Sequence, residues 1–167
     1  RIAAQYRKLL GMPDFRLNII DSPADARPDA VNIINVIPDN VTANPGQATP
    51  EAGAAAVAAL ERAVTDLRNG QVQAMVTAPI NKKTVQRDTF IFPGHTEYLQ
   101  SSLSENGEKA LMILFNDRLR VALVTTHVPV SRIAEALSKE LIVEKIRTFA
   151  RSLHQDFSID NPRIAVL

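Results

Sequence analysis

The sequence contains no cysteine in its 167 residues. This absence excludes disulfide bonds and thiolate metal sites. It fits a reducing compartment, and we expect a cytoplasmic protein. Only three histidines are present, so the surroundings of each one can be weighed individually.

A strong charge and a long apolar run are missing as well. The 19 basic and 18 acidic residues leave a net charge of +1, which does not point to a nucleic acid or an anionic membrane. No apolar run approaches the roughly 20 residues that cross a bilayer. The 46% hydrophobic and 22% charged content is typical of a soluble globular domain. We therefore expect neither a nucleic-acid partner nor a membrane partner.

Three common functional motifs are absent. The chain has no G-x-G-x-x-G, no G-x-x-x-x-G-K-[ST] and no G-x-S-x-G. A nucleotide would therefore bind in another way or to residues outside this sequence. The cofactor-binding residues stay unknown, and a hydrolase with a nucleophile elbow is not indicated.

Predicted strands and helices alternate along the chain, which favours an α/β fold with a mixed, largely parallel sheet flanked by helices. Thr49, Pro50 and Glu51 form a helix-start signal, and Gly70 is a natural stop. Ser131 is expected to cap a later helix. Strands are predicted at 15–20, 31–37, 71–78, 110–115, 119–125 and 162–167. Helices are predicted at 2–10, 49–69, 80–86, 96–103, 131–137 and 139–154.

Polar motifs follow several of these predicted strands. Residues 77–82 come after one strand, Gly94 to Glu97 lie beyond the next loop, and Thr125 to Pro129 end another strand. In open α/β sheets, ligands bind at the carboxyl ends of the strands. Two of the three histidines, His95 and His127, therefore fall at the predicted functional edge.

Each motif also has a purely structural interpretation. His127 could bind a metal together with further ligands, or hydrogen-bond a loop carbonyl. Thr96 could cap a short helix with Glu97 in its first turn, while the free N–H groups there could also receive a phosphate or carboxylate beside His95.

The remaining basic groups are less specific. Lys82 and Lys83 could assist phosphate binding, although solvated surface lysines are more common. His154 lies in a polar stretch late in a helix, and we interpret it as a surface residue.

Taken in order, several motifs carry a family resemblance. They are TPEAG (49–53), VTAPINK (76–82), FPGHTEYL (92–99), LRVALVTTHVP (119–129) and NPRIAVL (161–167). Together they resemble the 4-hydroxythreonine-4-phosphate dehydrogenases of pyridoxal phosphate biosynthesis. GHTE and TTHVP, both following a V-T-A-P strand, are specific in combination, whereas either motif alone would be weak.

The resemblance implies a fold like that of the isocitrate and isopropylmalate dehydrogenases, with two-lobed subunits and active sites shared in a homodimer. It implies oxidation of the substrate 3-hydroxyl by NAD (or NADP), followed by decarboxylation. A divalent cation (Zn, Mg or Co) would be held by three histidines, one from the partner. His127 matches the first metal ligand, and His95 and Thr96 match substrate-binding residues; no catalytic residue is assigned in this chain.

The sequence also departs from the family pattern. The Gly-Asp-Pro-Ala-Gly segment and the Asn-Pro-His segment are absent, so we expect residues 1–167 to be the central portion of a larger subunit, truncated at both ends. The stretch 104–107 is interpreted as a loop insertion. Three alternatives stay open: a dehydrogenase for a phosphorylated threonate or erythronate, a non-catalytic fragment that retains the fold and dimer surface, and a metal-dependent hydrolase using Glu97 as base.

Overall fold

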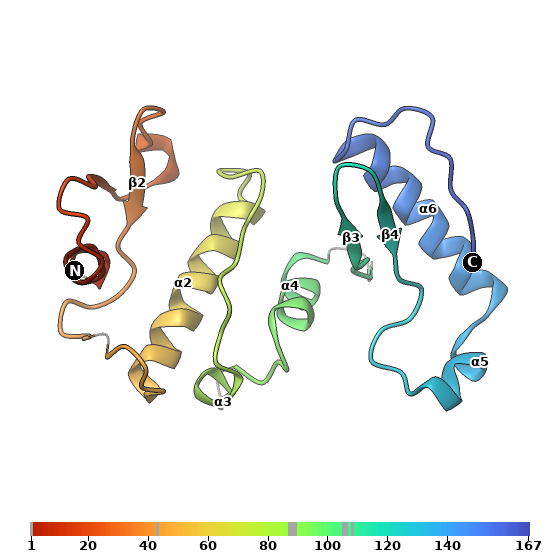
Figure 1. Cartoon of the computed structure of the whole chain (residues 1–167), viewed down its shortest axis with the longest axis horizontal. Helices are drawn as coiled ribbons and strands as arrows, with labels where there is room; N and C mark the ends of the chain where they lie inside the picture. Colours follow the sequence, from red (N-terminus) through yellow and green to blue (C-terminus); the bar gives the residue numbers. More distant parts are fainter. Residues whose placement is uncertain (1, 43, 87–89, 105–106, 108) are drawn as a thin grey trace. The chain divides into compact units, whose positions relative to one another are not determined.

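The structure, a computed structural model, describes residues 2–42, 44–86, 90–104, 107 and 109–167 (Figure 1). It divides into two compact units, Arg1–Glu108 and Lys109–Leu167, and each is described here by itself. The expected loop at 87–94 and the expected insertion at 104–107 lie partly outside the described residues.

The first unit begins with a helix and a pair of strands. β1 and β2 are parallel, with Leu17 opposite Val31 and Ile20 opposite Ile34. The predicted strands at 15–20 and 31–37 are thus confirmed, with shorter ends. The elements are α1 (Ile2–Leu9), β1 (Leu17–Ile20), the 3-10 turn η1 (Pro23–Asp25) and β2 (Val31–Ile34).

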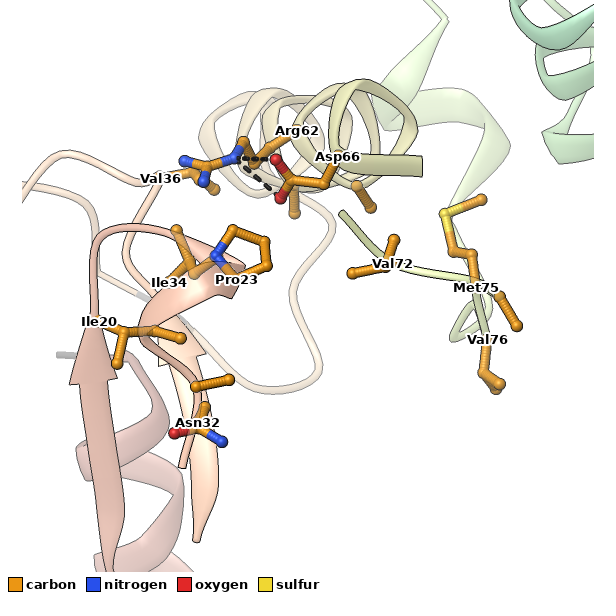
Figure 2. Close-up of a pocket in the computed structure, with 14 residues that line it drawn as sticks. Ile20, Pro23, Asn32, Ile34, Val36, Arg62, Asp66, Val72, Met75 and Val76 are labelled. Carbon is orange, nitrogen blue, oxygen red and sulfur yellow. Dashed lines mark hydrogen bonds and ion pairs between the residues drawn. The ribbon is translucent and has the colours of Figure 1, made fainter. Parts of the chain in front are cut away.

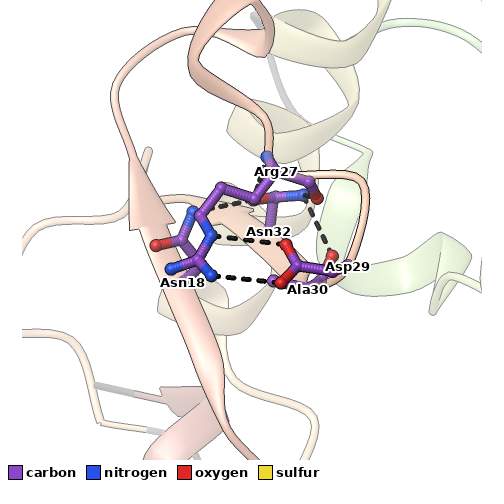
Figure 3. Close-up of polar contacts among 5 residues, drawn as sticks. All are labelled: Asn18, Arg27, Asp29, Ala30 and Asn32. Atoms are coloured by element: carbon purple, nitrogen blue, oxygen red, sulfur yellow. Dashed lines mark hydrogen bonds and ion pairs between the residues drawn. The ribbon is translucent and has the colours of Figure 1, made fainter.

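An asparagine at the centre of this strand pair ties the connecting loop to the sheet (Figure 3). The Asn32 side-chain oxygen accepts hydrogen bonds from Asn18 Nδ2 at 2.8 Å and from the Arg27 backbone N–H at 3.0 Å. Its amide nitrogen donates to the carbonyls of Arg27 and Ala30 at 2.8 and 3.0 Å. The polar side chain is fully paired, and these hydrogen bonds offset the cost of removing it from water.

The long helix α2 (Pro50–Arg68) begins and ends as predicted. The Thr49 hydroxyl accepts a hydrogen bond from Ala52 N at 3.2 Å, which satisfies one of the free N–H groups of the first turn. Asn69 is the C-cap, and Gly70 follows with φ +67°, a left-handed conformation that glycine adopts without strain.

The core of the first unit forms where α2 meets α3 (Lys82–Val85) and α4 (His95–Leu103). Leu60, Val85 and Phe90 are buried together. Phe92 and Tyr98 contact Phe90, with ring centroids 5.6 and 5.2 Å from it. These rings hold the start of α4 against the segment that precedes it.

The second unit begins with the predicted hairpin. Its strands are antiparallel, with Ile113 opposite Ala122. Asn116 Oδ1 accepts from the backbone N–H groups of Arg118 and Leu119, both at 2.9 Å, and so closes the turn. The elements are β3 (Ile113–Phe115), β4 (Arg120–Ala122), η2 (Val130–Arg132), α5 (Ile133–Ala136) and α6 (Lys139–Gln155).

The last helix packs by its apolar stripe and confirms the prediction for 139–154. Ser138 caps it by accepting from Leu141 N at 3.1 Å, and Phe149 and Leu153 are buried. The prediction that Ser131 caps a helix is wrong. The chain makes the 3-10 turn η2 at this point, and neither η2 nor α5 has a side-chain cap.

The α/β class is confirmed by the parallel strand pair and the helices around it, but two predicted strands are not observed. Among the described residues, segments 71–78 and 162–167 have no ladder partner. Val76 is 98% exposed. A strand exists only when a neighbour pairs with its backbone groups, so an apolar pattern alone cannot create one. No helix in the described part of the chain is long and apolar enough to cross a membrane.

Candidate functional site

In the first unit, residues of the motif at 76–82 and His95 of the GHTE motif line one cavity, although the predicted strand at 71–78, whose end was expected to bring them together, is not observed. The cavity measures about 250 Å³ and lies between α2 and the segment 75–80. Thr77, Pro79 and Ile80 line it on one side, and half-buried His95 lines it at the start of α4. A mostly apolar cavity edged by an imidazole and a helix terminus suits a small ligand with one polar end.

The start of α4 differs from the predicted one. The helix begins at His95, and the N-cap is Gly94, which has no side chain to bond the first turn. Thr96 is therefore the second residue of the helix, and the interpretation of Thr96 as its N-cap is wrong. The first N–H groups of a helix have no intrahelical acceptor. Because no side chain caps them here, they can receive an anionic oxygen.

Two oppositely charged side chains lie beside Gly94, which is buried. A Cβ placed on Gly94 would be 3.5 Å from Glu97 Oε2 and 3.8 Å from Lys82 Cε. Lys82 thus reaches over the N-terminus of α4 from α3. Lys83 has no such contact; its backbone N–H donates to Asn81 Oδ1, the N-cap of α3, at 3.1 Å. The sequence alone does not distinguish Lys82 from Lys83, because it does not show which residues lie near each of them in the fold.

His127 belongs to the second unit, in the segment between β4 and η2. It is exposed and has φ +58°, a left-handed conformation that is uncommon outside glycine and costs of order 1 kcal/mol or more. Within the described residues its ring makes no hydrogen bond or ion pair, so the alternative in which it bonds a loop carbonyl is not supported. The imidazole nitrogens are available to a ligand.

A metal centre requires more than this one histidine. Among the residues that the structure describes, no group of three or more His, Cys, Asp or Glu side chains could hold a metal ion. An unpaired imidazole is a suitable single ligand for Zn²⁺ or a similar cation. The described residues thus supply no metal centre around His127.

The third histidine is a surface residue, as interpreted from the sequence. His154 Nε2 lies 3.4 Å from Asp160 Oδ1, and both side chains are largely exposed. Such a pair contributes little to stability.

A second cavity was not anticipated from the sequence (Figure 2). It measures about 440 Å³ and is mostly apolar, with Ile34, Val36 and Met75 among its lining residues. At its edge Arg62 Nε donates to both carboxylate oxygens of Asp66 at 3.0 Å. The i, i+4 spacing of this pair in a predicted helix was the available signal.

The Arg62–Asp66 pair has a structural role. Asp66 is only 6% exposed, and the charge-assisted hydrogen bond that Arg62 Nε shares between its two oxygens compensates its buried charge. Arg62 Nη2 also donates to the carbonyl of Asp21 at 3.0 Å, which joins α2 to the end of β1. All of these groups are paired with one another, so they do not form a reactive centre.

Comparison with known proteins identifies the family of the chain. The family described as pyridoxal phosphate biosynthetic protein PdxA matches residues 1–167. A 4-hydroxythreonine-4-phosphate dehydrogenase of Bacteroides thetaiotaomicron is 47% identical over all 167 residues, which cover 45% of that protein. One from Sulfurihydrogenibium sp. is 35% identical over 161 residues, 96% of this chain and 48% of the relative. The chain thus spans about half the length of these relatives.

Solved structures show the same likeness. A 4-hydroxythreonine-4-phosphate dehydrogenase from Klebsiella pneumoniae has a TM-score of 0.76 at 29% identity, covering 97% of this chain and 49% of the other. A second one, from Burkholderia phymatum, has a TM-score of 0.79 at 27% identity, with coverage of 96% and 48%. With the family match over its whole length, the chain belongs to the PdxA family of pyridoxal phosphate biosynthetic proteins.

Proposed function

We propose that these 167 residues are the central portion of a larger, two-lobed subunit, a dehydrogenase that oxidises and decarboxylates 4-hydroxythreonine 4-phosphate in pyridoxal phosphate biosynthesis. The observation that carries the proposal is the uncapped start of α4, where His95 borders a cavity and Thr96 follows it in the first turn, in a chain 47% identical to a dehydrogenase of that name. We further propose a cytoplasmic homodimer with a shared active site, using NAD or NADP.

The residues at α4 are suited to hold a phosphorylated substrate. Its anionic group would accept hydrogen bonds from the backbone N–H groups of the first turn and from the Thr96 hydroxyl, with favourable interaction with the helix dipole. His95 would donate from its imidazole at the cavity edge. These contacts bind and orient the substrate, so His95 and Thr96 are proposed as substrate-binding residues rather than acids or bases.

His127 is proposed as one ligand of a divalent cation (Zn, Mg or Co). When bound, such a cation would supply Lewis-acid chemistry, making a substrate hydroxyl more acidic and a ketone more electron-poor. The strained backbone of His127 supports this role, because unusual backbone conformations cluster at functional sites.

The test is made on the full-length protein supplied with 4-hydroxythreonine 4-phosphate, NAD and a divalent metal, following NADH absorbance. We expect His127→Ala to abolish NADH formation and to reduce bound metal. His95→Ala should raise KM for the substrate while leaving the metal content near normal. The surface variant His154→Ala is the matched control and should behave as the parent protein.

The same assay separates the alternatives. Loss of metal in His95→Ala would show that the division of roles between the two histidines is wrong. Product release without any change in NADH absorbance would indicate a hydrolase. Activity on a phosphorylated threonate or erythronate, with none on 4-hydroxythreonine 4-phosphate, would move the proposal to the related dehydrogenases. No turnover of any of these substrates would favour a non-catalytic protein.

A further inference from the structure

Gly53 makes the tightest backbone approach that any described glycine shows. It is buried in the first turns of α2, and a Cβ placed on it would lie 2.0 Å from the carbonyl oxygen of Thr84 and 2.5 Å from its carbonyl carbon. These are main-chain atoms of α3, which a rotamer change cannot move aside. Any side chain at position 53 must therefore displace α3 from α2.

The displaced segment would move as one piece. The carbonyl of Asn81 accepts from the backbone N–H and the hydroxyl of Thr84, both at 3.0 Å, while Asn81 Oδ1 accepts from Lys83 N. On its other side α3 is anchored by Val85, which is only 2% exposed in the core. A shift at Thr84 is thus transmitted to the whole turn, including Lys82.

Lys82 is the member of this turn whose side-chain stem lies beside the start of α4. Its Cε lies beside Gly94, as described above, at the N-terminus of α4 where His95 and Thr96 begin the helix. Among the described residues its ammonium group has no ion pair. The neighbouring Glu97 carboxylate faces the same glycine, so a cation here also limits the repulsion that Glu97 would exert on an anionic ligand.

We propose that Lys82 is a further substrate contact, binding the anionic group held at the start of α4, and that Gly53 is the positioning residue that sets its reach. The inference rests on the proposed function, since it takes His95 and Thr96 as substrate-binding residues. Gly53 touches no substrate. It acts by allowing α2 and α3 to approach until Lys82 lies over Gly94.

The first experiment compares two adjacent lysines in the full-length protein. Lys82→Met keeps most of the apolar stem and removes the charge; we expect KM for 4-hydroxythreonine 4-phosphate to rise about tenfold or more, because a charge-assisted contact to an anion is lost. KM for NAD should not change. Lys83→Met is the matched control and should leave both constants unaltered. Equal behaviour of the two variants would overturn the proposed contact.

The second experiment tests whether Gly53 acts through Lys82. Gly53→Ala should raise the substrate KM with a smaller change in kcat, and should add little in a Lys82→Met background, because the group it positions is already gone. If the two substitutions raise the substrate KM independently, so that their fold-changes multiply in the double variant, Gly53 has only a structural role. If Gly53→Ala does not fold, Val85→Ala is used instead, because it loosens the packing of α3 in the core. Val85→Ala should then also add little to the substrate KM in the Lys82→Met background.

The outcome also distinguishes this inference from the proposed function. If His95→Ala and Lys82→Met both leave the substrate KM unchanged, the placement of the substrate at α4 is wrong. If His95→Ala impairs substrate use and Lys82→Met does not, the proposed function stands and only the role of Lys82 and Gly53 fails.

Discussion

His127 combines an exposed imidazole with a left-handed backbone (φ +58°). No hydrogen bond of its ring to the described residues explains why this strained conformation is kept. A residue held in such a region costs free energy that the surrounding segment must supply. Two substitutions of His127 therefore separate backbone strain from metal binding. Glycine and alanine both remove the imidazole, but only glycine removes the strain.

We predict that His127→Gly is more stable than His127→Ala by about 1 kcal/mol, since glycine adopts φ > 0 without a Cβ clash. The free energy of unfolding is measured by urea titration of the metal-free, full-length protein, so that lost metal binding does not contribute. Both variants should lose bound metal when it is supplied.

Ser158 offers the matched control, because it has φ +56° and is also exposed. Ser158→Gly should exceed Ser158→Ala in stability by a similar margin, while metal content stays unchanged in both. Equal stabilities of the two His127 variants would mean that the left-handed backbone at this position is not maintained in solution.

At the scale of single elements, the helix ends follow local chemistry closely. Thr49 and Ser138 cap α2 and α6 by accepting hydrogen bonds from the third residue beyond them. The cap at Thr49 was predicted, because a hydroxyl before an amphipathic run satisfies a backbone donor without help from the rest of the fold; the cap at Ser138 was not predicted, although the same rule applies to it. Thr96 and Ser131 are also hydroxyl residues near helix starts, but neither caps the helix beside it, so the cap interpretations at these two positions are wrong.

We predict that Thr49→Ala lowers the free energy of unfolding by about 1 kcal/mol, because the Ala52 N–H loses its acceptor. The control is Thr65→Ala in the same helix. Thr65 is exposed, and its hydroxyl donates only to the carbonyl of Glu61, which is already the acceptor of an intrahelical bond. Alanine should be neutral or slightly stabilising there. Chemical denaturation of the full-length protein measures both; equal losses would exclude capping as the cause.

At the scale of the whole molecule, the described part of the chain holds strand pairs rather than a continuous sheet. β1 pairs only with β2, and β3 only with β4. The apolar segment 71–78 has no partner there, and Val76 is almost fully exposed. Since the chain covers about half of its relatives, we propose that the rest of the subunit pairs with this segment.

We predict that the 167 residues alone bind Zn²⁺ weakly and form no NADH, because His127 is the only proposed metal ligand among them. Isothermal titration calorimetry with Zn²⁺ and the NADH assay provide the measurements, with the full-length protein as the positive control. Tight binding of one Zn²⁺ per chain would contradict the prediction and require further ligands within these residues.

The sequence by itself determined the family, the α/β class and the helix cap at Thr49, and it supplied the candidate residues His95, Thr96 and His127. These depend on local order along the chain: motif spacing, backbone propensities and short-range hydrogen bonds. Only the tertiary structure decided that Lys82 and not Lys83 lies beside Gly94, the N-cap of α4, and that Gly53 must lack a side chain. Each of these depends on the approach of segments distant in sequence, which local patterns do not determine. Segment 71–78 shows the same dependence. Its apolar pattern specifies a face to bury, whereas a strand also requires a neighbouring backbone.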